Sequence, residues 1–219
     1  FCKPTLAARE ETAAAVMEET GAAFIHPYND GRIIAGQATA AKELLEEVPD
    51  IDCLIAPVGG GGLLSGTALA AKYFAPGMEV YGAEPLAADD AVRSIHSGSL
   101  IPSENPKTIA DGLLTSLGDL TFPILRENLT DIFTVTEENI IYAMRLIWER
   151  MKLVAEPSGA VPLAAVLERV GVVPWEGANG FSKIGAGAGA AGGESSESAD
   201  NPFAGKRVGV IISGGNVDL

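Results

Sequence analysis

Basic residues and cysteines are both scarce in this sequence. In 219 residues, 15 lysines and arginines stand against 29 aspartates and glutamates, so the formal net charge is −14. Nucleic acids and anionic membranes attract positively charged surfaces, and this balance argues against either as a partner. The two cysteines, Cys2 and Cys53, have no zinc-binding spacing, and the lack of a disulfide framework suits a reducing compartment. We therefore expect a cytoplasmic protein.

Long apolar runs are also missing. No run reaches the roughly 18 residues that a membrane-spanning helix needs, and no secretory signal is visible. Hydrophobic residues nevertheless make up 47% of the sequence, which is enough for one sizeable core. The sequence starts at Phe1 without a methionine, and its last residues directly follow a predicted strand. We interpret it as a piece of a longer protein, truncated at the N-terminus.

Predicted strands alternate with predicted helices along the chain. The pattern predicts strands at about 22–25, 52–58, 78–83, 131–135 and 207–212. It predicts helices at about 5–20, 37–48, 63–75, 90–97, 136–153 and 156–170, with residues 99–120 irregular. Such alternation is typical of an α/β protein with a parallel twisted sheet flanked by helices.

The composition changes sharply at residues 177–201, which are rich in glycine, alanine, serine and glutamate. A segment of this kind buries too little apolar surface to offset the entropy lost on ordering. We expect a disordered surface insertion that proteases cut first.

An unusual glycine loop follows the most apolar predicted strand. The run Asp52 to Val58 ends in Gly59-Gly60-Gly61-Gly62, and helix-forming residues from Leu63 to Lys72 come next. A strand, a turn without Cβ atoms and a helix N-terminus together favour a phosphate site built from backbone amides. The alternative is a flexible turn. No lysine follows as in a P-loop, and the spacing is not G-x-G-x-x-G, so pyridoxal phosphate is the leading candidate ligand.

A second glycine-rich strand end lies at Ile212-Ser213-Gly214-Gly215. The carboxyl ends of parallel strands meet at one edge of a sheet, where ligands bind. The Ser213 hydroxyl could there hydrogen-bond a pyridine nitrogen without protonating it, which would limit the cofactor as an electron sink. A simple strand-to-loop turn is the alternative.

Acidic residues follow a third predicted strand. Glu84, Asp89 and Asp90 surround a proline-containing turn, and carboxylate and carbonyl oxygens are the ligands of Mg²⁺ and Ca²⁺. The alternative is a solvated loop in which an aspartate caps a helix. His26 and His96 have no triad partners and are interpreted as surface or interface residues.

The order of five motifs resembles that of serine racemases and serine/threonine dehydratases. These are fold-type II pyridoxal-phosphate enzymes, similar to the tryptophan synthase β chain, and the likeness covers nearly all of the chain outside about 174–204. The chain resembles their C-terminal two-thirds. The motifs are Gly59-Gly60-Gly61-Gly62-Leu63, Glu84-Pro85 with Ala88-Asp89-Asp90, Thr108-Ile109-Ala110-Asp111-Gly112, Glu156-Pro157-Ser158-Gly159-Ala160 and Ser213-Gly214-Gly215-Asn216-Val217-Asp218-Leu219.

The resemblance implies a role for each matching position. The amides of Gly59, Gly60, Gly61, Gly62 and Leu63 would bind the cofactor phosphate, Gly112 would lie by the ring, and Ser213 would bind the pyridine nitrogen. Glu84, the Ala88 carbonyl and Asp90 would bind Mg²⁺ or Ca²⁺, with Asp52 helping through water. Lys152 and Asn216 correspond to contacts of an ATP effector. Tyr28 departs from an asparagine of some members and stays unassigned.

The resemblance also implies what lies elsewhere. The Schiff-base lysine and the catalytic serine are expected upstream of Phe1, so this chain would contain no catalytic residue. Residues 1–28 would end a small domain, and residues 29–219 would form the large cofactor-binding domain of a homodimer.

The expected activity is that of a serine racemase that also dehydrates L-serine to pyruvate and ammonia. A catabolic threonine/serine dehydratase is the alternative enzyme. A third possibility is a non-catalytic fragment or pseudoenzyme that keeps only a phosphate-binding cradle.

Overall fold

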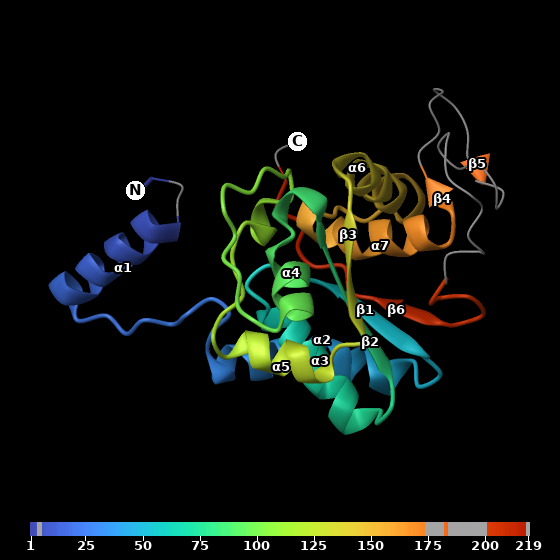
Figure 1. Cartoon of the computed structure of the whole chain (residues 1–219), viewed down its shortest axis with the longest axis horizontal. Coiled ribbons are helices and arrows are strands. Elements are labelled where there is room, and N and C mark those ends of the chain that lie inside the picture. Colours follow the sequence, from blue (N-terminus) through green and yellow to red (C-terminus); the bar gives the residue numbers. More distant parts are fainter. Residues whose placement is uncertain (4–5, 174–181, 184–200, 218–219) are drawn as a thin grey trace.

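The computed structural model describes residues 1–3, 6–173, 182–183 and 201–217. Its centre is a four-stranded sheet in the order β3-β2-β1-β6 (Figure 1), with every pair of neighbours parallel. The expected α/β class with a parallel sheet is confirmed. The strands are β1 (Cys53–Pro57), β2 (Glu79–Pro85), β3 (Asp131–Val135) and β6 (Val208–Val210).

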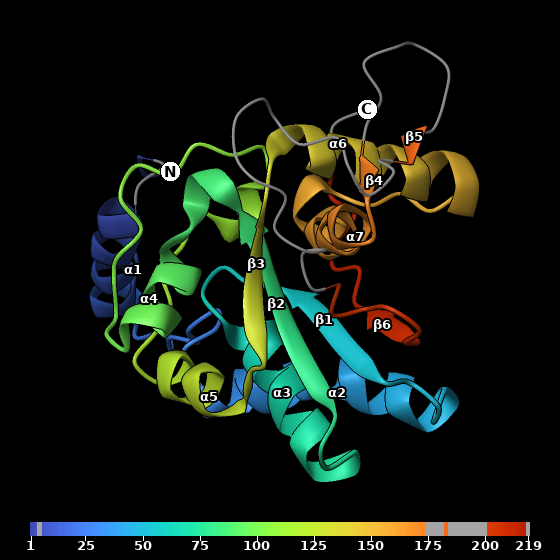
Figure 2. The ribbon, with the colours of Figure 1, turned by 45° about the vertical axis from the view of Figure 1, so that its right-hand side comes forward.

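Helices cover both faces of this sheet (Figure 2). Successive strand residues point to opposite faces, so the uninterrupted apolar run of β1 supplies two cores. Leu54 and Ala56 pack with α2 (Gly31–Glu47), α3 (Gly62–Phe74) and α5 (Thr121–Asn128). Cys53 and Ile55 pack with α6 (Glu137–Leu146) and α7 (Pro157–Arg169).

The start of α2 lies six residues earlier than the predicted Gln37. The Asp30 side chain caps the helix by accepting a hydrogen bond from the Arg32 amide (2.8 Å). The hydrogen bond from the Arg32 side chain lowers the pKa of Asp30 to about 2. The sequence Asp30-Gly31 is typical of a turn, so its capping role was not recognised and the predicted helix began too late. Val48, predicted inside the helix, follows its last residue and is exposed.

Helices α2 and α3 approach each other closely at Gly66. A Cβ atom built on Gly66 would lie 2.5 Å from the Ala38 nitrogen and 2.7 Å from the Ile34 oxygen. Only a residue without a side chain permits this separation of the two backbones. The close contact fixes α3, and with it the glycine loop at its N-terminus.

The first helix, α1 (Leu6–Thr20), ends at Gly21 as predicted, and it lies to the side of the sheet (Figure 1). The strand predicted at residues 22–25 is wrong. This segment connects α1 to the main body and pairs with no strand of the described residues. Its apolar Ile25 is 64% exposed, so an apolar run without a neighbouring strand did not become part of a sheet.

The middle of the chain follows the prediction with one omission. A short turn of 3₁₀ helix, η1 (Leu86–Ala88), leads into α4 (Asp90–Ser97), which ends at the left-handed Gly98. Residues 99–120 contain only one further 3₁₀ turn, η2 (Asp111–Leu113). Helix α5 was not predicted, because it is short and contains Pro123, which is tolerated only near a helix start.

The helix predicted at 136–153 is present, capped by Thr136, but it changes type near its end. The last turn is a π-helix, η3 (Ile147–Met151), followed by Lys152 in the left-handed conformation (φ +59°). A π-turn contains an extra residue, which shifts the buried stripe. Ile140 and Ile147 are buried as predicted, whereas Met151 is 52% exposed.

Of the expected insertion at 177–201, the structure describes Ser182, Lys183 and the last residue, Asn201. The first two of these residues form β5 (Ser182–Lys183), which pairs antiparallel with β4 (Val172–Val173). The disorder predicted for this segment stays a prediction, because its residues 177–181 and 184–200 lie outside the described part. Within that part, no helix is both long and apolar enough to cross a membrane.

The start of β6 is fixed by polar contacts. The Asp52 carboxylate accepts a hydrogen bond from the Arg207 amide (2.7 Å), and Lys206 forms an ion pair with Glu79. The Tyr81 hydroxyl donates to the same glutamate (3.0 Å). These contacts place β6 beside β1 in parallel register, so both strands end at the same edge of the sheet.

Candidate functional site

Unpaired backbone amides gather where β1 leads into α3. Among the hydrogen bonds of the described residues, none has the N–H group of any residue from Gly59 to Leu63 as donor. The first N–H groups of a helix have no partner within the helix. Together with the helix dipole, such N–H groups are able to bind an anion at the carboxyl edge of the sheet.

The glycines of this loop are closely surrounded. A Cβ atom on Gly59 would lie 3.0 Å from the Leu113 Cα atom, and one on Gly60 would collide with the ring of Tyr28. Gly61 has a φ of +87° and would place a Cβ atom 2.9 Å from Thr121. A loop packed in this way is held in one conformation, which favours the phosphate cradle over a flexible turn.

The other two residues expected at the cofactor lie around the N-terminus of α7. The Gly112 amide donates to the Ser158 hydroxyl (3.0 Å), and the Gly112 carbonyl oxygen lies 3.1 Å from a Cβ atom built on Gly59. The Ser213 carbonyl packs directly against Gly159. The structure thus brings the glycine loop, Gly112 and Ser213 to one end of the sheet, as the sequence predicted for the ends of β1 and β6.

A cavity of about 210 Å³ adjoins the glycine loop. Two of its lining residues, Tyr28 and Thr115, also contact the loop glycines, so the cavity and the cradle are neighbours. Its walls come from α1, from the segment after α1 and from Thr115: Arg9, Glu10, Ala13, Phe24, His26, Pro27, Tyr28 and Thr115.

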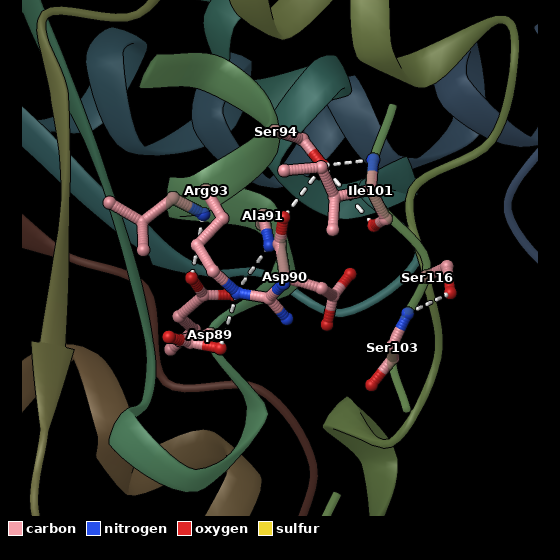
Figure 3. A network of polar contacts seen from close by, with 10 residues as sticks. Asp89, Asp90, Ala91, Arg93, Ser94, Ile101, Ser103 and Ser116 are labelled. Carbon is pink, nitrogen blue, oxygen red and sulfur yellow. Dashed lines mark hydrogen bonds and ion pairs between the residues drawn. The ribbon is translucent and has the colours of Figure 1, made fainter. Parts of the chain in front are cut away.

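Two of the three acidic residues at and after the end of β2, Glu84 and Asp90, are buried and not part of a solvated loop. Glu84 is 1% exposed, and its carboxylate accepts hydrogen bonds from the amides of Ala91 (3.2 Å) and Val92 (2.7 Å) at the start of α4. Asp90 is 2% exposed, and its Oδ2 atom has no hydrogen-bond partner. Figure 3 shows the Asp90 side chain pointing away from the partly exposed Asp89, which pairs with Arg93 (2.8 Å).

Burial changes the acidity of both carboxyl groups. It raises the pKa of Glu84 to about 8 and that of Asp90 to about 6, because an ionised carboxylate is poorly solvated there. The main-chain carbonyl of buried Ala88 lies in the same turn. Within the described residues no group of three or more acidic, histidine or cysteine side chains could hold a metal ion, so any site here combines two carboxylates with carbonyl oxygens.

The buried Glu84 makes the stability of the metal-free protein depend on pH. A raised pKa means that the folded state favours the protonated form of Glu84, so the contribution of Glu84 to the free energy of unfolding is fully present below the ordinary pKa of 4.5. This contribution is lost as the pH rises through about 8, and the loss is on the order of a few kcal/mol. Glu84→Gln should flatten this pH dependence in urea unfolding, and Glu43→Gln, on the exposed side of α2, should not. Identical slopes in wild type and Glu84→Gln would contradict the prediction.

Comparison with known proteins identifies the family. Residues 1–174 match the family described as "Pyridoxal-phosphate dependent enzyme". The chain belongs to this family. A beta-hydroxyaspartate dehydratase of Paracoccus denitrificans is 46% identical over all of this chain and 60% of its own length, and a serine racemase of Dictyostelium discoideum is 46% identical over all of this chain and 59% of its own. A solved threonine deaminase of T.th. has a TM-score of 0.79 and 43% identity, over 98% of this chain and 62% of that one. The chain thus spans about 60% of the length of these two curated relatives.

The residues present fit the cofactor of this pyridoxal-phosphate family. The loop of Gly59 to Leu63 offers unpaired amides to a phosphate, and a Cβ atom on any of its four glycines would collide with neighbouring residues that hold the loop in place. Ser213 follows β6, and no hydrogen bond of the described residues uses its hydroxyl, which leaves it able to donate to a ring nitrogen.

The structure places Asp52 far from the acidic residues that it was expected to assist. Asp52 precedes β1 and binds Arg207, whereas Glu84 lies near the far end of β2, five residues past the partner of Cys53. At about 3.3 Å per residue the two carboxylates are separated by roughly 20 Å, so the prediction that Asp52 supports the metal ion through water is wrong.

Lys152 and Asn216, the residues expected to contact a nucleotide effector, lie on neighbouring segments. Gly215 packs against Val154, and the main-chain amide of Asn216 donates a hydrogen bond to the Glu156 carboxylate (3.0 Å).

Several residues around the cradle of this pyridoxal-phosphate family member were not predicted. Tyr28 covers Gly60, Thr121 bonds its carbonyl oxygen, and Ser158 holds Gly112. Each lies tens of residues from the glycine that it contacts, so local sequence patterns carry no sign of the contact. Ser158 alone belongs to a motif that the resemblance had singled out.

Proposed function

We propose that the protein containing this chain is a pyridoxal-phosphate-dependent serine racemase that also eliminates water from L-serine to give pyruvate and ammonia. The observation that carries this proposal is the packed loop at the start of α3, where the amides of Gly59 to Leu63 have no acceptor among the described residues. The likeness to a serine racemase and to a hydroxyaspartate dehydratase supports the reaction class.

In this proposal, the chain binds and orients the cofactor. The loop amides hold its phosphate, Gly112 leaves room for the ring, and the Ser213 hydroxyl donates to the ring nitrogen. The cofactor supplies an electron sink for the electrons left when the α-proton of an amino acid is removed. Because a serine hydroxyl does not protonate the ring nitrogen, the sink is moderate, which suits racemisation and loss of a β-hydroxyl.

The groups that move the proton are proposed to lie outside this sequence. Lys42 and Lys72 form ion pairs with Glu46 and Glu127, and Lys206 pairs with Glu79 at the far end of the sheet. None of these lysines is placed to act at the cradle. We propose that the Schiff-base lysine and the catalytic serine belong to a segment upstream of Phe1.

The substrate is proposed to be a small amino acid with a β-hydroxyl group. Serine, threonine and 3-hydroxyaspartate share this group, and the names of the relatives include all three. The test is to supply each amino acid to the intact protein and to measure the keto acid and the D-isomer. Formation of D-serine together with pyruvate from L-serine supports the racemase. Formation of 2-oxobutyrate from L-threonine alone supports the alternative dehydratase. The absence of both turnover and cofactor binding supports a non-catalytic remnant.

We further propose that Glu84, the Ala88 carbonyl and Asp90 bind one Mg²⁺ or Ca²⁺ ion. The support is two buried carboxyl groups in one turn and the unpaired Asp90 Oδ2 atom. A divalent ion would neutralise the charge that burial disfavours, and would thereby lower the pKa of both groups. It would also fix the start of α4.

This metal proposal predicts a stability effect. Adding Mg²⁺ or Ca²⁺ at pH 8 should raise the melting temperature of the intact protein by several degrees, as expected for about 1–2 kcal/mol of binding linkage. Glu84→Ala should remove the response. Asp89→Ala, which removes the neighbouring and partly exposed carboxylate, should keep the response. An unchanged response in Glu84→Ala would mean that the ion binds elsewhere.

The remaining proposals concern the whole protein. We propose residues 1–28 as the end of a small domain and 29–219 as the large domain, which the lateral position of α1 supports (Figure 1). Lys152 and Asn216 are proposed to contact an ATP effector; the left-handed backbone of Lys152 after a π-turn supports this, because such strain is concentrated at functional sites. We propose a cytoplasmic homodimer without nucleic-acid or membrane partners.

A further inference from the structure

The hydroxyl of Thr121 lies at the centre of the contacts behind the glycine loop. Thr121 is the first residue of α5, is completely buried, and is 61 positions from Gly60 in the sequence. Its Oγ1 atom donates to the Gly60 carbonyl oxygen (2.8 Å) and accepts from the Gly118 amide (2.8 Å). The Gly118 carbonyl is 3.3 Å away and already accepts from the Phe122 amide, so the single hydroxyl proton is best used by Gly60.

The hydrogen bond to Gly60 fixes the direction of the next amide. In a planar trans peptide, the C=O and the N–H group point in opposite directions. With its carbonyl oxygen held by Thr121, the Gly60–Gly61 peptide turns the Gly61 N–H away from α5. That N–H has no acceptor among the described residues.

The peptide needs such a restraint because it joins two glycines. Glycine permits both signs of φ at little cost, so this peptide plane could rotate and turn the Gly61 N–H away from the cradle. The observed φ of Gly61, +87°, is one that few other residues adopt. A Cβ atom on Gly61 would also lie 2.9 Å from Thr121, so the two residues are in direct packing contact.

Thr121 is itself held firmly in place. The Asn29 Oδ1 atom accepts from the Leu120 amide (2.9 Å), and the Asn29 Nδ2 atom donates to Asp119 (2.5 Å). Gly118 packs directly against the Asn29 side chain. The segment before α2 therefore anchors the turn that carries Thr121.

We propose that Thr121 is a positioning residue that orients the Gly60–Gly61 peptide so that the Gly61 amide binds the phosphate of pyridoxal phosphate. The inference rests on the proposed cofactor-binding function of the glycine loop. It assigns Thr121 a role in selecting phosphorylated over unphosphorylated pyridoxal, although the side chain itself touches no ligand.

The test compares pyridoxal phosphate with pyridoxal, which lacks the phosphate, as ligands of the intact protein. Thr121→Val keeps the shape and removes the hydroxyl; it should weaken pyridoxal phosphate binding about tenfold, the worth of one charge-assisted hydrogen bond, and leave pyridoxal binding unchanged. Thr121→Ser should restore the wild-type preference. Thr67→Val is the matched control, because this buried threonine donates only to the Leu63 carbonyl within α3 (2.9 Å).

A second measurement does not depend on the variant folding. In the wild-type protein, the amide signal of Gly61 should shift strongly downfield on addition of pyridoxal phosphate and little on addition of pyridoxal. Equal weakening of both ligands by Thr121→Val, or a Gly61 amide that does not respond to the phosphate, would overturn the inference. If the wild-type protein binds both ligands equally weakly, the proposed function itself fails, and that result is distinguishable from the other two.

Discussion

Replacing Gly60 with aspartate is expected to abolish the binding of pyridoxal phosphate by the intact protein. The new Cβ atom would enter the ring of Tyr28, and the carboxylate would stand beside the phosphate dianion. Steric displacement and like-charge repulsion in a partly desolvated loop each cost a few kcal/mol, so the affinity should fall roughly a thousandfold or more. Titration followed by the absorbance of the bound cofactor measures the loss.

Two further variants separate the causes. Gly60→Ala adds only the Cβ atom and should weaken binding less than Gly60→Asp. Gly36→Asp introduces the same side chain on the exposed side of α2, where a Cβ atom meets nothing within 4 Å, and should leave binding intact. Normal cofactor binding by Gly60→Asp would disprove the phosphate cradle.

A protein made of these 219 residues alone is expected to show neither serine turnover nor the absorbance of a Schiff base with pyridoxal phosphate. The chain is proposed to provide phosphate and ring contacts, whereas the lysines Lys42, Lys72 and Lys206 form ion pairs elsewhere. Loss of covalent attachment and of the proton-moving groups removes the chemistry, so the rate should fall to background, at least about a millionfold.

The control is the same chain joined to the proposed segment upstream of Phe1. Absorbance and turnover should return together in that longer protein. A lysine that formed a Schiff base within residues 1–219, detected by borohydride reduction and peptide mapping, would contradict the prediction and relocate the catalytic lysine into this chain.

The sequence predicted those elements whose signals are local. The bounds of β3 were predicted correctly, and β1 and α3 were placed to within a few residues, because uninterrupted apolar runs and the glycines between them mark their ends. The strand expected at 22–25 failed because strand formation depends on a neighbour, which composition does not reveal. The start of α2 was missed because Asp30 looks like part of a turn until its capping contact is seen.

In the candidate site, too, the features with local signals could be predicted from the sequence, and those that depend on long-range packing could not. Glycines after two adjacent strands are visible in the sequence, and parallel topology alone predicts that they meet. What surrounds them is not visible: Tyr28 and Thr121 reach the loop from distant positions, and the sequence left a solvated loop open as the alternative for Glu84 and Asp90 because it does not reveal their burial. Burial and long-range contacts depend on the packed fold, so they needed the structure.

The polar contacts at the start of β6 have a consequence for how this protein can change over generations. Asp50 and Asp52 hold Arg207, and Glu79 holds Lys206, immediately before the strand begins. Codons gained or lost between Val173 and Asn201 would therefore alter the length of the chain there without moving Ser213, because the register of β6 is set after that point. Ser213 and the glycine loop would keep their relative positions through such a change, because β6 stays paired with β1.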